Sequence, residues 1–191
     1  MLEVELKAVV EDAAGTRKRL EAAGATLQFA GRMEDRRYDT PDGRFARRDV
    51  VIRLRVYRAS DGAVPEARLD WKGASSSDSG YKIRDELSTM VGDAVTLATI
   101  LDRLGFIVTR EVDRQIWQYK LGPAMVRFEQ YPRMDVLLEV EGSPEAIERA
   151  IGTTGIPRSH FSDERLLDFV ARFEERTGLD AALSDRELAN A

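Results

Sequence analysis

Segments in which charged side chains alternate with aliphatic ones recur along most of this chain of 191 residues. The first such segment, EVELK, places Glu3, Glu5 and Lys7 at every second position, with Val4 and Leu6 between them. Successive side chains of a β-strand point to opposite faces, so the segment is expected to be a strand with one charged and one apolar face. A solvated outer face would explain one strand of this kind, but its repetition in other strands needs a further explanation.

The same alternation predicts seven more strands, and apolar residues at helical spacing predict the helices between and after them. The strands are expected over residues 26–39, 50–59, 66–73, 81–90, 106–119, 124–131 and 135–142. The helices are expected over residues 11–23, 93–104, 143–151 and 163–178, with a weak helix or disorder over residues 179–191. The length fits one domain, expected over residues 1–178, followed by a short tail.

The charges on these strand faces are segregated by sign. Arg53 and Arg55 share one face of their strand, whereas Glu139 and Glu141 share one face of another. The full set comprises the acids Glu3, Glu5, Glu86, Glu129, Glu139 and Glu141 and the bases Lys7, Arg53, Arg55, Lys72, Arg84, Arg114 and Arg127. About eight strands with apolar opposite faces predict a closed barrel or a strongly curved sheet, with helices packed outside and a charged lumen.

A charged lumen is costly unless a bound group neutralises it. The guanidinium fork of arginine and the point charge of lysine match phosphate oxygens, so the bases favour a polyanion. Carboxylates cannot bind phosphate directly, and they are suited to a hard divalent cation such as Mg²⁺ or Mn²⁺, shared with phosphate oxygens. The pattern therefore predicts a complex of a metal ion and a triphosphate inside the barrel.

Composition excludes several other kinds of site. The chain has no cysteine and a single histidine, His160, so disulfides, thiolate chemistry, a serine–histidine triad and a multi-histidine zinc site are not expected. A net charge of −5 argues against general nucleic-acid binding. Without a long apolar run or a signal-like N-terminus, no membrane contact is expected and the location is expected to be cytoplasmic.

The EVELK segment resembles the E-x-E-x-K signature of the CYTH superfamily, also called the triphosphate tunnel metalloenzymes. The segments YDTPDG, IRLR, WKG, IRDELS and LLEVEG follow in the order that the family shows. The resemblance covers about residues 1–170. It implies an α+β fold, an eight-stranded antiparallel closed barrel with helices outside, whose tunnel binds a triphosphate and one or two Mg²⁺ or Mn²⁺ ions; family analogy also suggests a homodimer.

The resemblance also implies roles for individual residues. The implied metal ligands are Glu3, Glu5, Glu139 and Glu141. The implied triphosphate-binding residues are Lys7, Arg53, Arg55, Lys72, Arg84, Arg114 and Arg158, the last on a segment that closes over the tunnel. The implied catalytic residues are Glu5, Lys7 and Glu129, the last of which stands where the family usually has aspartate.

Three functions remain open at the level of sequence. The first is metal-dependent hydrolysis of a small triphosphate, either inorganic or organic. The second is a class IV adenylyl cyclase, although cyclases of this family typically carry a lysine where this chain has Val112. The third is a non-catalytic nucleotide or polyphosphate sensor. The arginines near the TPDG turn are expected to be solvated or to gather an anionic substrate, namely Arg32, Arg36, Arg37, Arg44, Arg47 and Arg48.

Overall fold

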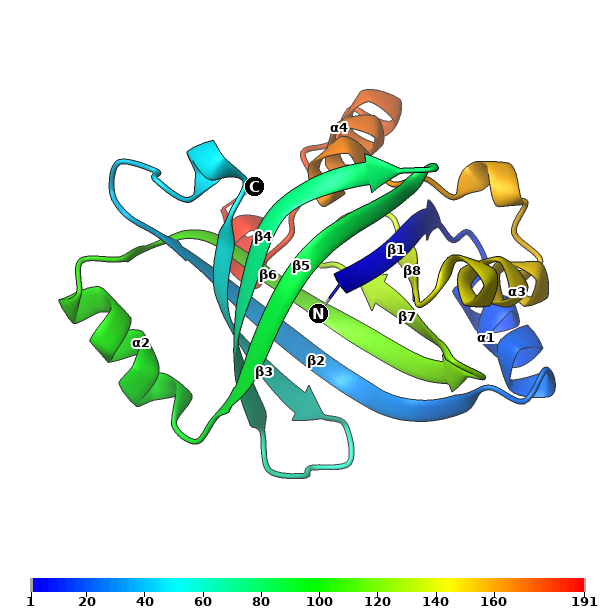
Figure 1. The fold of residues 1–191 in the computed structure, drawn as a ribbon, viewed down its shortest axis with the longest axis horizontal. Helices are drawn as coiled ribbons and strands as arrows, with labels where there is room; N and C mark the ends of the chain where they lie inside the picture. The colour runs from blue at the N-terminus through cyan, green and yellow to red at the C-terminus, as the bar shows by residue number, and fades with distance from the viewer. Residues whose placement is uncertain (1, 191) are drawn as a thin grey trace.

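Eight antiparallel strands close into a barrel in a computed structural model of the protein, which describes residues 2–190 (Figure 1). The strands are β1 (Leu2–Val9), β2 (Thr26–Asp39), β3 (Val51–Ala59), β4 (Glu66–Asp78), β5 (Tyr81–Val91), β6 (Ile107–Leu121), β7 (Ala124–Gln130) and β8 (Leu137–Glu141). Around the barrel they follow the order β1-β5-β4-β3-β2-β6-β7-β8, with β8 paired back to β1. The expected α+β fold with a closed eight-stranded barrel is thereby confirmed.

The helices lie outside this barrel (Figure 1). They are α1 (Ala13–Ala22), α2 (Ala94–Arg103), α3 (Pro144–Thr154), α4 (Leu166–Thr177) and α5 (Asp185–Ala189), with short 3-10 turns at Ala46–Arg48 and Arg158–His160. Ser143 caps α3, because its hydroxyl accepts a hydrogen bond from the Ala146 amide at 3.3 Å, and α4 ends at Gly178 in the left-handed conformation. None of the described helices is long and apolar enough to cross a membrane.

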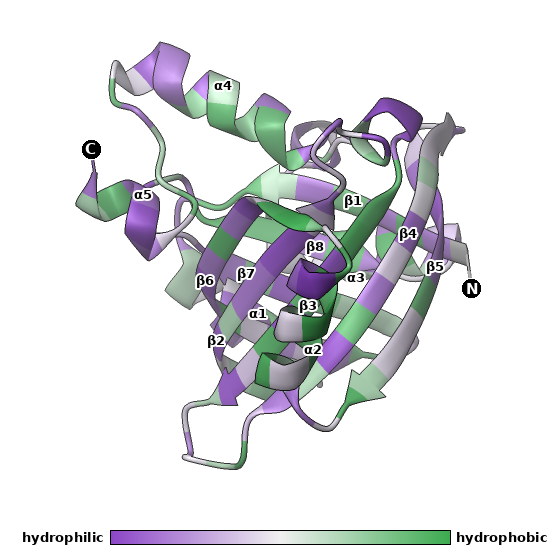
Figure 2. Cartoon of the chain, turned by 90° about the vertical axis from the view of Figure 1, so that its left-hand side faces the viewer, coloured by the Kyte–Doolittle hydropathy of each residue, from purple (hydrophilic) through white to green (hydrophobic). Residues whose placement is uncertain are grey.

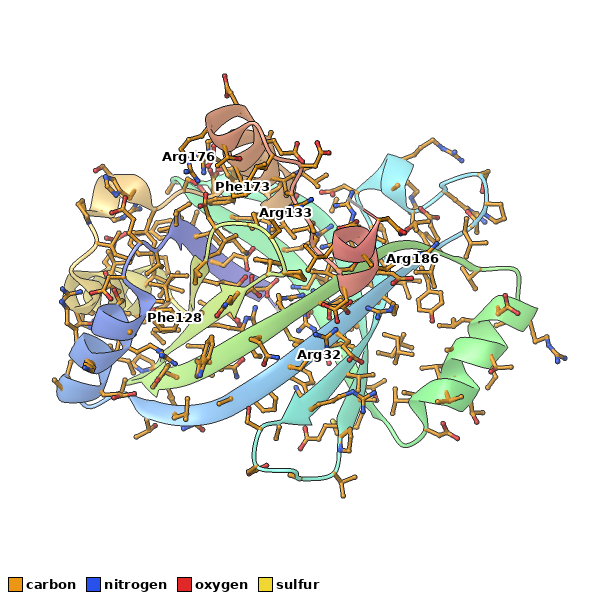
Figure 3. The ribbon with its side chains drawn as sticks, turned by 180° about the vertical axis from the view of Figure 1, so that it is seen from behind. Arg32, Phe128, Arg133, Phe173, Arg176 and Arg186 are labelled. Atoms are coloured by element: carbon orange, nitrogen blue, oxygen red, sulfur yellow. The ribbon has the colours of Figure 1, made fainter. Side chains whose placement is uncertain are left out.

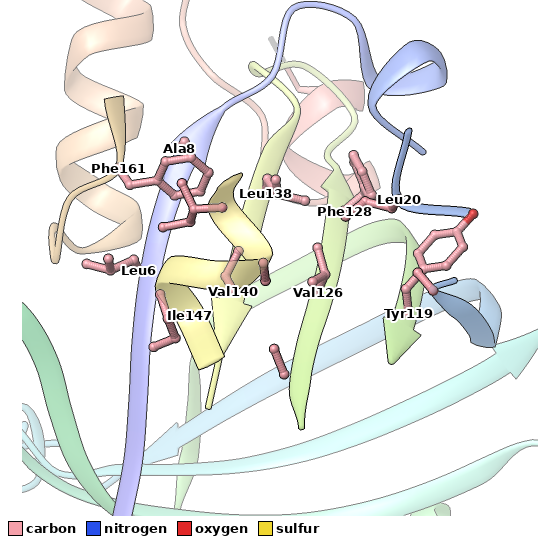
Figure 4. Packing of buried hydrophobic residues seen from close by; sticks show 14 of the residues in the cluster. Leu6, Ala8, Leu20, Tyr119, Val126, Phe128, Leu138, Val140, Ile147 and Phe161 are labelled. Atoms are coloured by element: carbon pink, nitrogen blue, oxygen red, sulfur yellow. The ribbon is translucent and has the colours of Figure 1, made fainter. Parts of the chain in front are cut away.

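The largest hydrophobic core lies between the barrel wall and helices α1 and α3 (Figure 4). Leu6, Val126 and Val140 project outward from β1, β7 and β8 and pack with Leu20 of α1 and Ile147 of α3. All five side chains are fully buried, and burial of each aliphatic side chain contributes about 1.5–3 kcal/mol. Because the outward positions of these strands supply the core, the alternate, charged positions point into the lumen.

Two smaller cores fix the other helices. In one of them, Leu101 of α2 packs on Tyr38 and Leu54 of the barrel wall. In the other, Phe169 of α4 and Leu183 of the C-terminal segment pack on Val112 of β6, Leu137 of β8 and Tyr131. Figure 2 shows α4 along one side of the barrel and α5 close to the C-terminus. Hydrophobic contacts therefore hold α4 and the segment that precedes α5 against the barrel.

The tail is ordered on the barrel, where the sequence predicts a weak helix or disorder. The Asp113 amide donates to the Leu183 carbonyl at 2.7 Å, and Arg133 and Ala182 exchange two backbone hydrogen bonds. Arg32 of β2 and Arg186 of α5, both labelled in Figure 3, form ion pairs between the tail and the barrel. Arg32 pairs with Asp185 at 2.6 Å, and Arg186 pairs with Glu111 at 3.2 Å. Backbone pairing leaves no pattern in side-chain chemistry, so this docking could not be predicted from the order of residue types. Met1 and Ala191, the outer ends of the expected domain and tail, lie outside the described residues.

Candidate active site in the barrel lumen

Two cavities lie inside the barrel and meet near its middle. One has a volume of about 410 Å³ and the other of about 530 Å³. Arg53, Arg55, Arg127 and Glu139 line both cavities. The two cavities are therefore halves of one tunnel, with these four side chains at the junction.

The two halves differ in charge. Among the described residues, eleven basic and six acidic side chains line the first cavity, which we call the basic cavity. Four basic and five acidic side chains line the second, which we call the acidic cavity. The separation of sign that the sequence predicts is thus present along the tunnel. One end suits an anion, and the other suits a cation or a neutral group.

Asp35 lies at the centre of the basic residues. Its carboxylate accepts hydrogen bonds from Arg55 Nε at 2.7 Å and from Arg114 at 3.1 Å, and Arg53 approaches to 3.8 Å. The residue is 1% exposed. Burial opposes its charge, but Arg55, Arg114 and Arg53 outweigh burial and hold the pKa of Asp35 well below its usual range. Asp35 therefore fixes the orientation of these arginines.

Asp70 has the same role on β4, two strands away from Asp35 on β2. It accepts a hydrogen bond from Arg53 Nε at 2.8 Å and another from the Ser88 hydroxyl at 2.7 Å. Neither Asp35 nor Asp70 was among the expected site residues. The signal that could have found Asp70 is its position two residues before Lys72, which places both side chains on the lumen face of β4.

Lys7 joins the acids of the junction. Its ammonium lies 2.9 Å from Glu5 and 2.5 Å from Glu139. Burial opposes this charge, but Glu139 and Glu5 outweigh burial and raise the pKa of Lys7 above its ordinary value. Glu139 also pairs with Arg127, and although burial acts against ionisation, Arg127 and Lys7 hold the pKa of Glu139 well below its usual range. Lys7 and Glu139 are therefore both charged.

Glu129 lies on the wall beside the basic cavity. It accepts from Arg114 Nε at 3.0 Å and from the Tyr131 hydroxyl at 2.7 Å, and it is 2% exposed. Burial opposes its ionisation, but Arg114 and Arg127 overcome burial and the nearby Glu139, so the pKa of Glu129 is lowered. A buried, ionised carboxylate in this position can orient a water molecule or the hydrogen-bond donors around a phosphate.

Glu141 at the acidic cavity is in a different electrostatic state. Burial, together with the nearby carboxylates of Glu139 and Glu3, raises the pKa of Glu141 to about 7. No hydrogen bond or ion pair engages its side chain within residues 2–190. Carboxylates that repel one another around a cavity, with free oxygen acceptors, match the ligand chemistry of Mg²⁺ and Mn²⁺. The donor set therefore fits a hard divalent cation.

Three of the four expected metal ligands, Glu3, Glu5 and Glu139, are engaged by lysines in this structure. Glu3 accepts from Lys72 at 2.6 Å, and Glu5 pairs with Lys7 and Lys82. No group of three or more acidic or histidine side chains within residues 2–190 is already gathered in a metal-binding arrangement. Binding of a cation would therefore require Glu3 and Glu5 to exchange lysine partners for it.

The structure brings most of the predicted site residues together at the tunnel wall. Those that line one or both cavities are Glu3, Glu5, Lys7, Arg53, Arg55, Lys72, Arg84, Arg114, Glu129, Glu139 and Glu141. Arg84 is held by the backbone carbonyl of Asp49 at 2.5 Å.

Arg158 is placed elsewhere, outside the tunnel. It forms an ion pair with Glu148 at 2.8 Å and lies over the Tyr81 ring, and its side chain is 42% exposed. It lines neither cavity. The charged residue that the C-terminal segment does bring to the basic cavity is Arg165.

Arg37 lies in the lumen and not in solvent, so the expectation that it is solvated is wrong, and its alternative role in gathering an anionic substrate stays a prediction. Arg32 and Arg36 point outward and pair with Asp113, at 3.4 Å and 2.7 Å. Arg37 lines the basic cavity together with Arg110. Charges occupy both faces of β2 around this point, so alternation alone did not reveal which face was the inner one.

The comparisons with known proteins agree with this fold. The family described as the CYTH domain matches residues 1–152, and the chain therefore belongs to the CYTH family. A search of curated proteins gives no match.

Solved structures with the same fold come from archaea, bacteria and a plant. Protein PH1819 from Pyrococcus horikoshii OT3 has a TM-score of 0.72 at 22% identity, with 89% of this chain and 98% of that chain covered. A putative adenylate cyclase from Vibrio parahaemolyticus has a TM-score of 0.75 at 14% identity, with 90% and 98% covered. HpAC1 from Hippeastrum, described as a putative adenylyl cyclase with a dominant triphosphatase activity, has a TM-score of 0.52 at 15% identity, with 96% and 90% covered. At these identities the similarity shows the fold.

Proposed function

We propose that the protein is a divalent-metal-dependent triphosphatase that hydrolyses an inorganic or organic triphosphate bound in its barrel lumen. The observation that carries the proposal is the division of one tunnel into a basic and an acidic half that meet at Arg53, Arg55, Arg127 and Glu139. A triphosphate that carries a metal ion has both kinds of charge and matches both halves.

The charged residues that line the tunnel have distinct roles in this proposed reaction. Lys7, Arg53 and Arg55, with Lys72, Arg84 and Arg114 around them, bind the phosphate oxygens and offset the charge that develops during in-line displacement. Glu5 and Glu129 orient the attacking water. Glu3, Glu5, Glu139 and Glu141 would hold the Mg²⁺ or Mn²⁺ ion, which when bound polarises a phosphoryl oxygen as a Lewis acid.

Adenylyl cyclase activity is the second candidate, and we rank it lower. Cyclisation expels pyrophosphate and gains from an additional base beside the leaving group. Val112 faces this part of the lumen as a 1% exposed aliphatic side chain packed with Tyr131 and Phe169. The triphosphatase activity described for the Hippeastrum protein also supports placing hydrolysis first.

Product analysis tests the proposal. The protein is incubated with ATP or tripolyphosphate in the presence of Mg²⁺ or Mn²⁺, and the products are separated by chromatography. Orthophosphate with ADP or pyrophosphate is the expected result. Cyclic AMP as the main product would show that the protein is a cyclase and not a triphosphatase. Tight binding of the triphosphate without turnover would show that it is a non-catalytic sensor.

Glu141→Gln provides the matched variant. The amide keeps the shape but removes the negative charge, so turnover at ordinary Mg²⁺ concentration should fall by about 10²-fold or more. Because Glu141 has no ion pair among the described residues, the fold should be retained. Glu145→Gln on the exposed surface of α3 is the control and should keep wild-type turnover.

A further inference from the structure

Three arginines lie side by side across the wall of the basic cavity. In the strand register, Arg37 of β2 is paired with Arg53 of β3 on one side and with Arg110 of β6 on the other. Paired residues on neighbouring antiparallel strands share a face, and the strands are about 4.8 Å apart. All three residues line the basic cavity. We call Arg37, Arg53 and Arg110 the arginine row.

Two members of the arginine row have no acidic partner. Arg53 pairs with Asp70 at 2.8 Å. No side-chain hydrogen bond or ion pair engages Arg37 or Arg110 within residues 2–190, and the buried Nε of Arg37 has no acceptor. This distinguishes them from Arg55 and Arg114, which share Asp35.

Both acids two residues from Arg37 on β2, Asp35 and Asp39, are already occupied. Asp35 pairs with Arg55 and Arg114, and its charge offsets that of Arg37 only in part. Asp39 lines the basic cavity, but its carboxylate accepts hydrogen bonds from the amides of Thr40, Phe45 and Ala46 at 2.7–2.9 Å. It therefore holds the following loop in place and leaves Arg37 without a partner. A register shift after Arg37 turns the next part of β6 toward the same cavity.

The arrangement is electrostatically unfavourable without an anion. Burial, then the neighbouring charges of Arg53 and Arg110, lowers the pKa of Arg37 to about 10. At neutral pH the guanidinium is still charged, so three like charges remain adjacent in a partly desolvated wall. An anion placed against the row would remove this repulsion and supply the missing acceptors.

We infer that the arginine row binds the terminal phosphoryl group of the substrate, with Arg37 and Arg110 as additional binding residues beside Arg53. A terminal phosphoryl group has three free oxygens and a charge of about −1.5 to −2 near neutral pH, more than a bridging phosphate carries. Three adjacent guanidinium groups match that charge and oxygen count. The remainder of the phosphate chain then extends toward Arg55 and Arg127 at the junction. This inference rests on the proposed function for the identity of the ligand.

Calorimetric measurement of ligand affinity in the presence of a chelator tests the role of the arginine row. The chelator removes the metal, so that binding is measured without turnover. The two probes are ATP, which has a terminal phosphoryl group, and diadenosine triphosphate, in which every phosphate is bridged at both ends. Wild-type protein should bind ATP more tightly. Arg37→Gln should weaken ATP binding by about tenfold or more, since a charge-assisted hydrogen bond is lost, and should leave diadenosine triphosphate nearly unchanged.

Control variants separate charge recognition from folding. Arg58→Gln removes one charge from the outer face of β3, where Arg58 pairs with Glu34 at 3.4 Å, and should bind both probes as wild type does. Arg37→Lys keeps the charge without the planar fork and should have intermediate affinity for ATP. The melting temperature of Arg37→Gln should not fall, because the substitution removes an unpaired charge. Arg110→Gln provides the same test from the neighbouring strand.

The outcomes that would overturn the inference differ from those that would overturn the proposed function. If Arg37→Gln and Arg110→Gln bind ATP as tightly as wild type does, or lose affinity for both probes equally, the arginine row does not recognise a terminal phosphoryl group. Either result would leave the proposed triphosphatase activity unaffected. If wild-type protein neither binds nor hydrolyses ATP and tripolyphosphate, the proposed function itself is wrong.

Discussion

At the scale of single residues, the lumen contains two kinds of arginine, and they should respond differently to substitution. Arg55 shares the buried carboxylate of Asp35, whereas no hydrogen bond or ion pair with an acid engages the Arg37 side chain within the described residues. Removal of one member of a buried pair leaves the other without compensation, but removal of an unpaired charge relieves repulsion.

Substitution of Arg55 should therefore affect both binding and stability. Arg55→Gln is expected to weaken tripolyphosphate binding and to lower the free energy of unfolding by about 1–3 kcal/mol, because Asp35 loses its 2.7 Å partner and keeps Arg114 and Arg53. Arg37→Gln should weaken binding alone. Urea unfolding of the two variants without ligand makes the comparison. Equal stability of both would show that the Arg55–Asp35 pair does not support the fold.

Asp35 itself is expected to be the most sensitive acid in the lumen. Asp35→Asn should lower the free energy of unfolding by about 3–5 kcal/mol, because Arg55, Arg114 and Arg53 lose their shared buried carboxylate. Asp61→Asn in the exposed turn after β3 is the control and should change stability by less than about 0.5 kcal/mol. Chemical unfolding at neutral pH measures both. Tripolyphosphate should restore part of the stability that Asp35→Asn loses, because it supplies negative charge to the same arginines.

The pH dependence of stability follows from the lowered pKa of Asp35. An aspartate in the unfolded chain has a pKa near 3.9, and the folded value is lower, so the stabilisation is fully present above about pH 5 and is lost as the pH falls through the folded pKa. Urea midpoints between pH 3 and pH 7 should therefore fall less steeply for Asp35→Asn than for wild type. Parallel pH profiles would mean that other carboxylates account for the acid sensitivity.

At the scale of elements, the sequence identified nearly every strand and helix but not the inner face of each strand. Where charge and aliphatic residues alternate cleanly, as in β1 and β8, the pattern placed Glu5 and Glu139 in the lumen correctly. In β2, charged residues occupy consecutive positions on both faces, so Asp35 and Arg37 could not be distinguished from Arg36 without the barrel pairing.

The C-terminal segment is the element that sequence described least well. Its position depends on backbone hydrogen bonds to Asp113 and Arg133 and on the burial of Ala182, Leu183 and Ser184, none of which produces a periodic pattern. The position of Arg158 could not be predicted from the sequence either. Its ion pair with Glu148 depends on how α3 and the following turn are arranged in space.

Leu183 offers a test of how firmly this segment is attached. Leu183→Ala should reduce the free energy of unfolding by about 2–5 kcal/mol, since the side chain is 6% exposed and packs with Tyr131, Leu137 and Phe169. Leu188→Ala in α5 is the matched control, because Leu188 is 42% exposed, and it should be nearly neutral. Thermal or urea unfolding distinguishes them. Similar stability of both variants would indicate that the tail detaches without effect on the barrel.

At the scale of the whole molecule, the excess of bases in the basic cavity predicts that a polyanion stabilises the folded state even without metal. Tripolyphosphate at about 100 times its Kd should add about 2.7 kcal/mol to the free energy of unfolding. For a chain of this size that corresponds to a rise in Tm of roughly 5–10 °C. Thermal unfolding in a chelator, with sodium chloride of matched ionic strength as the control, measures the effect. A rise of the same size in sodium chloride would mean that general screening, and not binding in the lumen, is responsible.

The position of β1 between β5 and β8 has a consequence for how the protein is made. β1 spans Leu2–Val9 and β8 spans Leu137–Glu141. β1 therefore cannot pair with β8 until the chain between them has been synthesised. At ~5–20 residues per second this delay is on the order of ten seconds. During that time β1 is an unpaired strand edge, which readily associates with other chains. The alternation of Glu3, Glu5 and Lys7 places a charge at every second position of this edge, and such charges discourage aggregation. The same side chains that line the lumen of the closed barrel thus protect the nascent chain before the barrel closes.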